Sequence, residues 1–180
     1  CSSDLNPNFF TKFPIKPVRD LVAITQVVDV PGCLVVHPSL PVKTTKELVA
    51  YLTANAGKLN YGAPAASSAN RLDMEIFLGK TGTRAVAVVY KGGAGPAAIG
   101  LLGGEVQLMF VTLSSAVNFV KSGKLRMLGV VAPERVAAVP DALTMREQGY
   151  DMTIGSWQGL FAPAGTPRAV VTKLYSVMQE

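Results

Sequence analysis

The chain has 180 residues, enough for one domain or for one lobe with parts of a second. Hydrophobic residues make up 49% and charged residues 16%, a composition that can bury a core and is not that of a disordered protein. No stretch approaches the roughly 20 apolar residues of a membrane-spanning helix, so we expect the chain not to span a membrane. The net charge of +5 comes from scattered lysines and arginines, which argues against a nucleic-acid partner and leaves a mild attraction for anions.

The N-terminal residues give little information about compartment or chemistry. Residues 1–4 lack the charged and apolar regions of a signal peptide, and there is no initiator Met, so we expect the numbering to begin inside a longer protein. Two cysteines, Cys1 and Cys33, leave a disulfide undecided and fit no zinc motif. The one histidine, His37, has no second ligand in a metal-binding pattern, so we expect neither a metal nor a cofactor.

An interrupted apolar strand precedes the first helix. Residues 21–28 predict a strand, Pro31-Gly32 breaks it, and residues 33–37 resume it, which is typical of a crossing between two lobes or of a plain strand with a bulge. Residues 44–52 then predict a helix. Thr44 is its expected cap and Glu47 completes a capping box.

A strand, a loop of small residues and a helix follow. Residues 58–61 predict the strand and residues 62–72 contain the loop, in which Ser67 and Ser68 stand where a helix cap belongs. The expected apolar stripe of the helix is Leu72, Ile76 and Phe77. Free N–H groups at a helix start suit a carboxylate or phosphate. Taken alone, however, this stretch is more typical of an ordinary capped helix.

The same order of elements occurs twice more. The second unit is strand 85–90, loop 91–95 and a helix from Pro96 that Gly103-Gly104 ends. The third is strand 107–110, a loop with Thr112, Ser114 and Ser115, and helix 116–120. Repeated strand–loop–helix units predict a parallel sheet, in which ligands bind outside the carboxyl ends of the strands. We therefore expect three helix starts to face one crevice that suits a small anion.

The C-terminal part predicts further strands and two helices. These elements are strand 125–131, helix 143–148, strand segments 150–154 and 156–162, and a last helix with Thr166 as cap and Pro167 as first residue. The last helix has apolar positions at Val170, Val171, Leu174 and Val177.

Motifs that carry a family resemblance lie in order along almost the whole chain. They are F-P-I-K-P-V-R-D-L (13–21), V-V-H-P-S-L-P-V-K-T-T-K-E-L (35–48), G-K-L-N-Y-G (57–62), V-Y-K-G-G-A-G-P-A-A-I-G-L-L-G-G-E-V (89–106), K-S-G-K-L-R-M-L-G-V (121–130), V-P-D-A-L-T-M-R-E-Q-G-Y (139–150) and G-L-F-A-P-A-G-T-P (159–167). Together they resemble the tripartite tricarboxylate transporter receptor family, the TctC or Bug-type periplasmic solute-binding proteins. Each motif is modest, and the set is specific.

The resemblance implies an α/β, type II periplasmic-binding fold that closes two lobes on a small carboxylate or acidic amino acid. It implies a periplasmic receptor, not an enzyme, that delivers its ligand to membrane permease subunits of the transporter. Residues 31–155 would form most of lobe two, with a mainly parallel sheet flanked by helices. Residues 1–30 would be a lobe-one fragment with the first crossover strand, and residues 156–180 the returning crossover strand and a lobe-one helix. Measured against the family, the start of lobe one and the C-terminal end would be missing.

Ligand contacts are carried over from the family by position. They are Ser67, Ser68, Asn70, Gly92, Gly93, Ala94, Thr112, Ser2, Ser3 and Trp157. The loop after Phe110 departs from the pattern, since family members often carry Asp-Asn where this chain has Val111-Thr112. Because an acid is a natural partner for a ligand amino group, the departure favours a plain organic acid over an amino acid.

The sequence bears on two other functional classes, enzymes and transcription regulators. Residues 93–98 match G-x-G-x-x-A, but no Asp or Glu lies between Val106 and Pro133 to bind a ribose, which argues against a dinucleotide-binding enzyme. The chain lacks the G-x-S-x-G elbow of a hydrolase, and its single histidine, His37, would have to serve any catalytic triad. An effector-binding domain of a transcription regulator remains open. A signal peptide in the longer protein would favour transport, and a helix-turn-helix would favour regulation.

Overall fold

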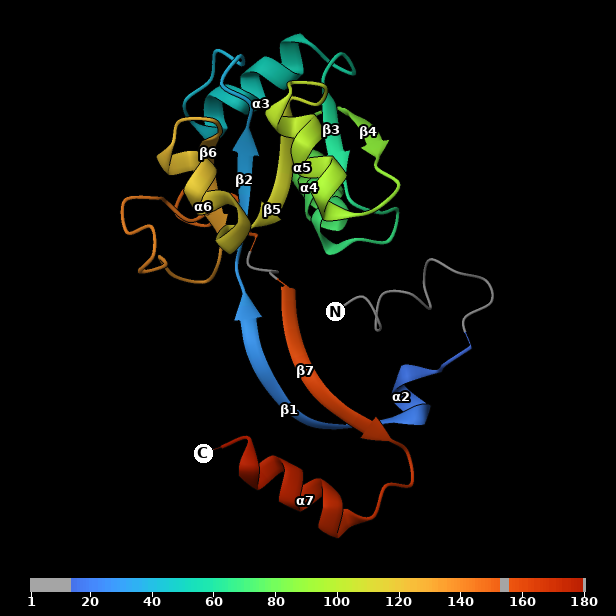
Figure 1. The fold of residues 1–180 in the computed structure, drawn as a ribbon. Coiled ribbons are helices and arrows are strands. Elements are labelled where there is room, and N and C mark those ends of the chain that lie inside the picture. The colour runs from blue at the N-terminus through green and yellow to red at the C-terminus, as the bar shows by residue number, and fades with distance from the viewer. Residues whose placement is uncertain (1–13, 153–155, 180) are drawn as a thin grey trace. The chain divides into compact units, whose positions relative to one another are not determined.

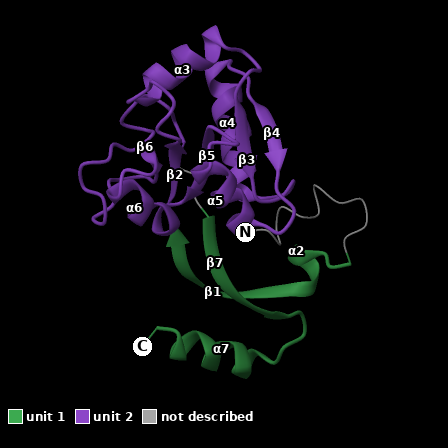
Figure 2. Cartoon of the chain, turned by 45° about the horizontal axis from the view of Figure 1, so that its top comes forward, with its two compact units in different colours: residues 1–30, 156–180 green, residues 31–155 purple. Residues whose placement is uncertain are grey.

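The structure is a computed structural model that describes residues 14–152 and 156–179. The chain forms two compact units, coloured separately in Figure 2. Unit 1 comprises residues 1–30 and 156–180, and unit 2 comprises Pro31–Gly155. The assignment of these units to the lobes of a binding protein stays a prediction.

Unit 2 is built on a five-stranded sheet with the strand order β4-β3-β5-β2-β6 (Figure 1). Its elements in chain order are β2 (Gly32–Val36), α3 (Thr45–Ala54), β3 (Asn60–Ala63), α4 (Ala69–Thr81), β4 (Val86–Val89), α5 (Ala94–Leu102), β5 (Leu108–Thr112), α6 (Leu113–Lys121) and β6 (Arg126–Val131). The three predicted strand–loop–helix units are therefore present as β3–α4, β4–α5 and β5–α6.

The sheet is mixed rather than purely parallel. β3 pairs in parallel with β4 and β5, whereas β2 pairs antiparallel with both β5 and β6. Four strands thus run in one direction and β2 runs in the other between two of them. The alternation of strands and helices predicts the direction of consecutive units, but it carries no information on the direction of a strand that inserts between them. The carboxyl ends of β3, β4, β5 and β6 therefore lie together with the start of β2, and we name this border of the sheet the carboxyl edge.

Helices cover both faces of the sheet, and the side chains of β2 alternate between the two faces. Leu34 and Val36 pack in one core cluster, and Cys33 and Val35 pack in the other. The first cluster takes its helical side chains from α3 and α4, among them Leu48, Leu52, Met74 and Phe77. The second takes them from α5 and α6, among them Ala97, Leu101, Leu113 and Ala116. Because β2 is apolar on both faces, burial of this strand contributes to both cores, by about 25 cal/mol for each Å² of apolar surface.

The predicted capping box of α3 is confirmed. Thr44 Oγ1 accepts a hydrogen bond from the Glu47 N–H at 3.1 Å, and Glu47 Oε2 accepts from the Lys43 N–H at 2.6 Å. The reciprocal bond thus reaches one residue further back than in the usual box. Thr45 is buried next to the cap and donates to the Leu128 carbonyl, which ties the start of α3 to β6.

The predicted helix at 143–148 is wrong, and the chain there forms turns. Thr144 and Glu147 make both bonds of a capping box: Glu147 N–H donates to Thr144 Oγ1 at 3.0 Å, and Thr144 N–H donates to Glu147 Oε2 at 2.8 Å. The turn stops at Gly149, whose φ of +86° is outside the helical region. A local cap therefore forms without a helix to follow it. Residues 150–152 are not a strand, and residues 153–155 lie outside the described part.

Unit 1 contains α2 (Pro17–Asp20), β1 (Leu21–Val30), β7 (Ser156–Pro163) and α7 (Arg168–Val177). β1 and β7 form an antiparallel two-stranded sheet, and α7 contacts β1. The predicted cap of α7 is wrong, because Thr166 Oγ1 donates to the Pro163 carbonyl at 2.7 Å and Pro167 takes the cap position. Within the described residues, no helix has both the length and the apolarity needed to cross a membrane.

Candidate functional site

Three helices of unit 2 begin at the carboxyl edge. α4, α5 and α6 each follow a strand that ends there, namely β3, β4 and β5, and these three strands run in the same direction (Figure 1). The first N–H groups of a helix have no partner inside the helix, and the N-terminus carries a partial positive charge of roughly +0.5. The carboxyl edge therefore presents backbone hydrogen-bond donors from three helix starts.

Ser68 is the N-cap of α4, as the sequence predicts. Its Oγ accepts from the Arg71 N–H at 3.3 Å and donates to the Ala65 carbonyl at 2.9 Å, so its hydroxyl is already used by the fold. The Ser67 hydroxyl and the Asn70 side chain form no hydrogen bond with the described residues, and both residues are half-buried. Among the described groups, the N–H groups of Ala69 and Asn70 likewise have no acceptor. α4 thus offers two backbone donors and two free polar side chains.

The loop before α5 depends on two glycines. Gly92 has a φ of +104° and Gly93, the N-cap, has a φ of +88°, a region that side chains with a Cβ rarely enter. The helix starts at Ala94, so Pro96 is its third residue and not its first as predicted. The N–H groups of Gly92, Ala94 and Gly95 meet no acceptor within the described part of the chain. The loop therefore presents three backbone donors around the helix start, while the Gly93 N–H between them donates to the Tyr90 carbonyl at 3.4 Å.

α6 begins at Leu113, three residues earlier than predicted. Thr112 is the N-cap, and its Oγ1 donates to Ser115 Oγ at 3.0 Å, while Ser115 Oγ donates to the Thr112 carbonyl at 2.8 Å. The Leu113 N–H donates to the carbonyl of Pro31, which precedes β2. The N–H groups of Ser114 and Ser115 have no acceptor among the described residues. Ser114 and Ser115 therefore lie in the first turn of α6, where they contribute backbone donors, and not in a loop as the sequence predicts.

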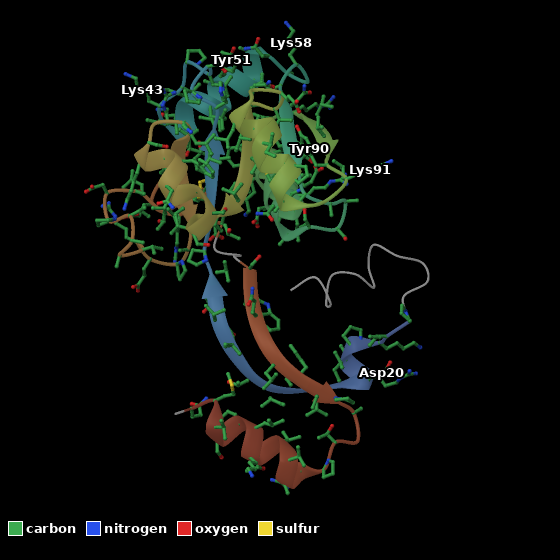
Figure 3. The ribbon with its side chains drawn as sticks, viewed as in Figure 1. Asp20, Lys43, Tyr51, Lys58, Tyr90 and Lys91 are labelled. Carbon is green, nitrogen blue, oxygen red and sulfur yellow. The ribbon has the colours of Figure 1, made fainter. Side chains whose placement is uncertain are left out.

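Charged side chains contribute little positive charge to the edge. Arg71 lies 3.6 Å from Glu75, four residues on, and donates to the Ala66 carbonyl at 3.4 Å. Glu75 also accepts from the hydroxyl of Tyr61, whose pKa rises to about 12 chiefly because it is buried, with the Glu75 charge adding to the effect. Lys91 is exposed and extends outward from the loop after β4 (Figure 3). The positive potential of the edge thus comes mainly from the helix starts.

Asp73 on α4 is a polar residue at this edge that the sequence analysis missed. The expected stripe of α4 was Leu72, Ile76 and Phe77, whereas the buried residues are Asp73, Met74, Phe77 and Leu78. Asp73 is 6% exposed, and burial raises the pKa of its carboxyl to about 7. Its spacing of four residues from Phe77 is the signal that could have placed it on the buried face.

Three further predicted contacts lie outside the described part of unit 2. Ser2 and Ser3 lie outside them. Trp157 belongs to β7 of unit 1, where it is half-buried and packs its ring at 6.0 Å from that of Phe161. A role for Trp157 in ligand binding stays a prediction. Among residues 14–152 and 156–179, no group of three His, Cys, Asp or Glu side chains could hold a metal ion.

Comparison with known proteins gives one family for the whole chain. The sequence profile described as tripartite tricarboxylate transporter family receptor, TctC, matches residues 2–180. BugT of Bordetella pertussis is 33% identical over 162 residues, which are 89% of this chain and 49% of that protein. The predicted TctC or Bug-type resemblance is therefore confirmed.

Solved structures give the same answer for the fold. R. palustris Rpa4515 with adipate is similar with a TM-score of 0.86 at 30% identity, over 94% of this chain and 56% of that one. MatC from Rhodopseudomonas palustris with bound malate has a TM-score of 0.83 at 29% identity, over 94% of this chain and 58% of that one. These similarities confirm the α/β, type II periplasmic-binding fold. The chain spans about half the length of the curated relatives it matches.

Proposed function

The chain belongs to the tripartite tricarboxylate transporter receptor family, and we propose that it is part of a periplasmic receptor that binds a small carboxylate and delivers it to a membrane permease of that transporter type. The family consists of solute-binding proteins, which are not enzymes. Adipate and malate, bound in the two similar structures from R. palustris, are both dicarboxylates, which supports a carboxylate as the ligand class.

The observation that carries the proposal is the set of free backbone N–H groups at the carboxyl edge. At the starts of α4, α5 and α6, backbone N–H groups have no acceptor among residues 14–152 and 156–179. Arg71, the cation nearest in sequence to the start of α4, is engaged by Glu75. A carboxylate that accepts from such N–H groups forms charge-assisted hydrogen bonds, each worth about 1.5–3 kcal/mol. Oriented dipoles suit a small anion because they bind charge without demanding a buried cation.

Binding in the complete receptor is proposed to work by hinge closure. A ligand favours the closed form when only that form brings donors from both lobes to it. The carboxyl edge of unit 2 would supply the donors of one lobe. The regions of the relatives that this chain does not span would supply most of the other.

The test uses isothermal titration calorimetry of the full-length receptor with succinate, glutarate, adipate, malate and glutamate. Ala94→Pro removes one free N–H at the first position of α5, where proline is well tolerated, so it should weaken binding about tenfold or more without loss of stability. Ser67→Ala should weaken binding by about 1 kcal/mol. Ser122→Ala, at the opposite end of α6, is the control and should bind as the wild type does. Unchanged affinity in Ala94→Pro and Ser67→Ala would refute the site, and no binding of any acid would refute the receptor proposal.

A further inference from the structure

The buried polar side chains of unit 2 have hydrogen-bond partners, with one exception. Thr45 donates to the Leu128 carbonyl, Thr83 shares a bond with Thr81, and Thr144 bonds to Glu147. Asp73, at 6% exposure, forms no hydrogen bond or ion pair with the described residues. A buried carboxylate without a partner opposes folding, so its presence calls for an explanation other than stability.

The Asp73 carboxylate lies at the carboxyl edge. A methyl group placed on Gly32 would lie 3.7 Å from Asp73 Oδ2. Gly32 is the first residue of β2, and it pairs with Thr112 and Val131, the last residues of β5 and β6. Every fully buried side-chain oxygen or nitrogen of the described residues has a hydrogen-bond partner. Because the Asp73 carboxylate has none, its oxygens are not fully buried and belong to the small exposed part of the residue. The carboxylate therefore reaches solvent at the edge where the helices begin.

No cation of the surrounding elements neutralises this carboxylate. β2 and β5 carry no charged residue, and the one charge on β6, Arg126, donates to the carbonyls of Leu40 and Val42. On α4 itself, Arg71 pairs with Glu75. Asp73 is thus an acceptor without a neutralising cation near Gly32 at the carboxyl edge, the border of the sheet where α4, α5 and α6 begin.

We infer that Asp73 accepts a hydrogen bond from a hydroxyl or ammonium group of the bound acid, so that the receptor prefers hydroxy- or amino-carboxylic acids to plain dicarboxylic acids of the same length. The inference rests on the proposed function. Helix N–H groups hold the ligand carboxylate, and Asp73 holds a donor group that a plain dicarboxylate lacks. A second carboxylate placed beside Asp73 would instead meet a like charge.

This inference replaces an expectation from the sequence. Val111-Thr112 stands where family members often carry Asp-Asn, which had suggested a plain organic acid. The methyl position on Gly32 that lies 3.7 Å from Asp73 Oδ2 also lies 3.7 Å from the Val111 carbonyl oxygen. Asp73, from α4, therefore brings an acid to the same corner of the sheet from a different element.

The test measures selectivity with ligands of matched length, by isothermal titration calorimetry of the full-length receptor near pH 8. One set is succinate, malate and aspartate, and the other is glutarate, 2-hydroxyglutarate and glutamate. We expect the wild type to bind the best hydroxy or amino acid of a set about tenfold or more tightly than the plain acid. Asp73→Asn should reduce this ratio by about tenfold, and most strongly for an amino acid, because the amide carries no charge.

Two further variants make the result specific. Glu75→Gln removes an acid from the same helix that is already engaged by Tyr61 and Arg71, and it should leave the ratio unchanged. Gly32→Ala places a methyl group beside the Asp73 carboxylate and should weaken the hydroxy and amino ligands more than the plain acids. A wild-type ratio near one, or a ratio that Asp73→Asn leaves unchanged while acids still bind, would overturn the inference but not the receptor proposal. Failure of the wild type to bind any of these acids would refute both.

Discussion

The buried Asp73 carboxyl should lower the free energy of unfolding as pH rises, and replacing Asp73 with Asn should remove this pH dependence. Burial raises the pKa of the Asp73 carboxyl from 3.8 to about 7, so between these values the folded state binds a proton that the unfolded state has released. The free energy of unfolding therefore falls as pH increases through this range. At about 1.4 kcal/mol for each pKa unit, the free energy of unfolding falls by about 4 kcal/mol between a pH below 3.8 and a pH above about 7.

Other carboxylates act in the opposite direction, which makes the comparison with a variant necessary. The pKa of Glu147 is lowered by the hydrogen bond from the Thr144 N–H and then by Arg135, so its contribution is present at neutral pH and is lost as pH falls. Asp20 behaves in the same way, chiefly because Arg19 donates to it. Both carboxylates remain in Asp73→Asn, so the difference between variant and wild type isolates Asp73.

The assay is urea unfolding of both proteins at about pH 4, 5.5, 7 and 8, followed by circular dichroism. The free energy of unfolding of Asp73→Asn should match that of the wild type within about 1 kcal/mol at the lowest pH. At the highest pH it should exceed the wild-type value by up to about 4 kcal/mol. Asp141→Asn, which replaces an exposed carboxylate, controls for the loss of one negative charge. Parallel curves for wild type and Asp73→Asn across the whole range would show that the carboxylate is not desolvated and would refute the reasoning.

Three further predictions concern single contacts. Thr44→Ala should lower the free energy of unfolding by about 1 kcal/mol, measured by urea denaturation, because the Glu47 N–H loses its acceptor, and no change would contradict the capping role. Gly100→Ala should lower the free energy of unfolding by about 1–3 kcal/mol, because the new methyl group would overlap the Tyr90 hydroxyl and displace it from Glu105. In a Tyr90→Ala background the same substitution should lower it little, and equal losses in both backgrounds would refute the clash. Cys33 is fully buried and burial raises its pKa to about 12, so mass spectrometry should find it unmodified by iodoacetamide in the native protein and alkylated in urea; rapid native alkylation would contradict this.

Part of the candidate site could be predicted from the sequence because it depends on neighbours within a few residues. The Ser68 cap and the Gly92-Gly93 turn follow from local hydrogen bonding and backbone freedom. The helix starts themselves were less accurate, since α5 and α6 begin two and three residues before the expected positions 96 and 116. Helix boundaries shift by such amounts because tertiary packing stabilises or removes a first turn.

The sequence by itself determined the order of strands and helices from β1 to β6, the capping box of α3 and the three strand ends at which helices begin. These features are local, and a side chain that bonds three residues away makes the same bond in any surrounding fold. Even so, the capping bonds of Thr144 and Glu147 form without the predicted helix, because Gly149 ends the turn.

Only the tertiary structure decided the direction of β2 and the environment of Asp73. β2 lies between β5 and β6 and pairs Cys33 with Val111 and Val130, far along the chain. Asp73 meets Gly32 only because α4 packs on the face of the sheet that carries Leu34 and Val36. Contacts between distant segments depend on how complete elements pack, and a pattern read over a few residues does not contain that information.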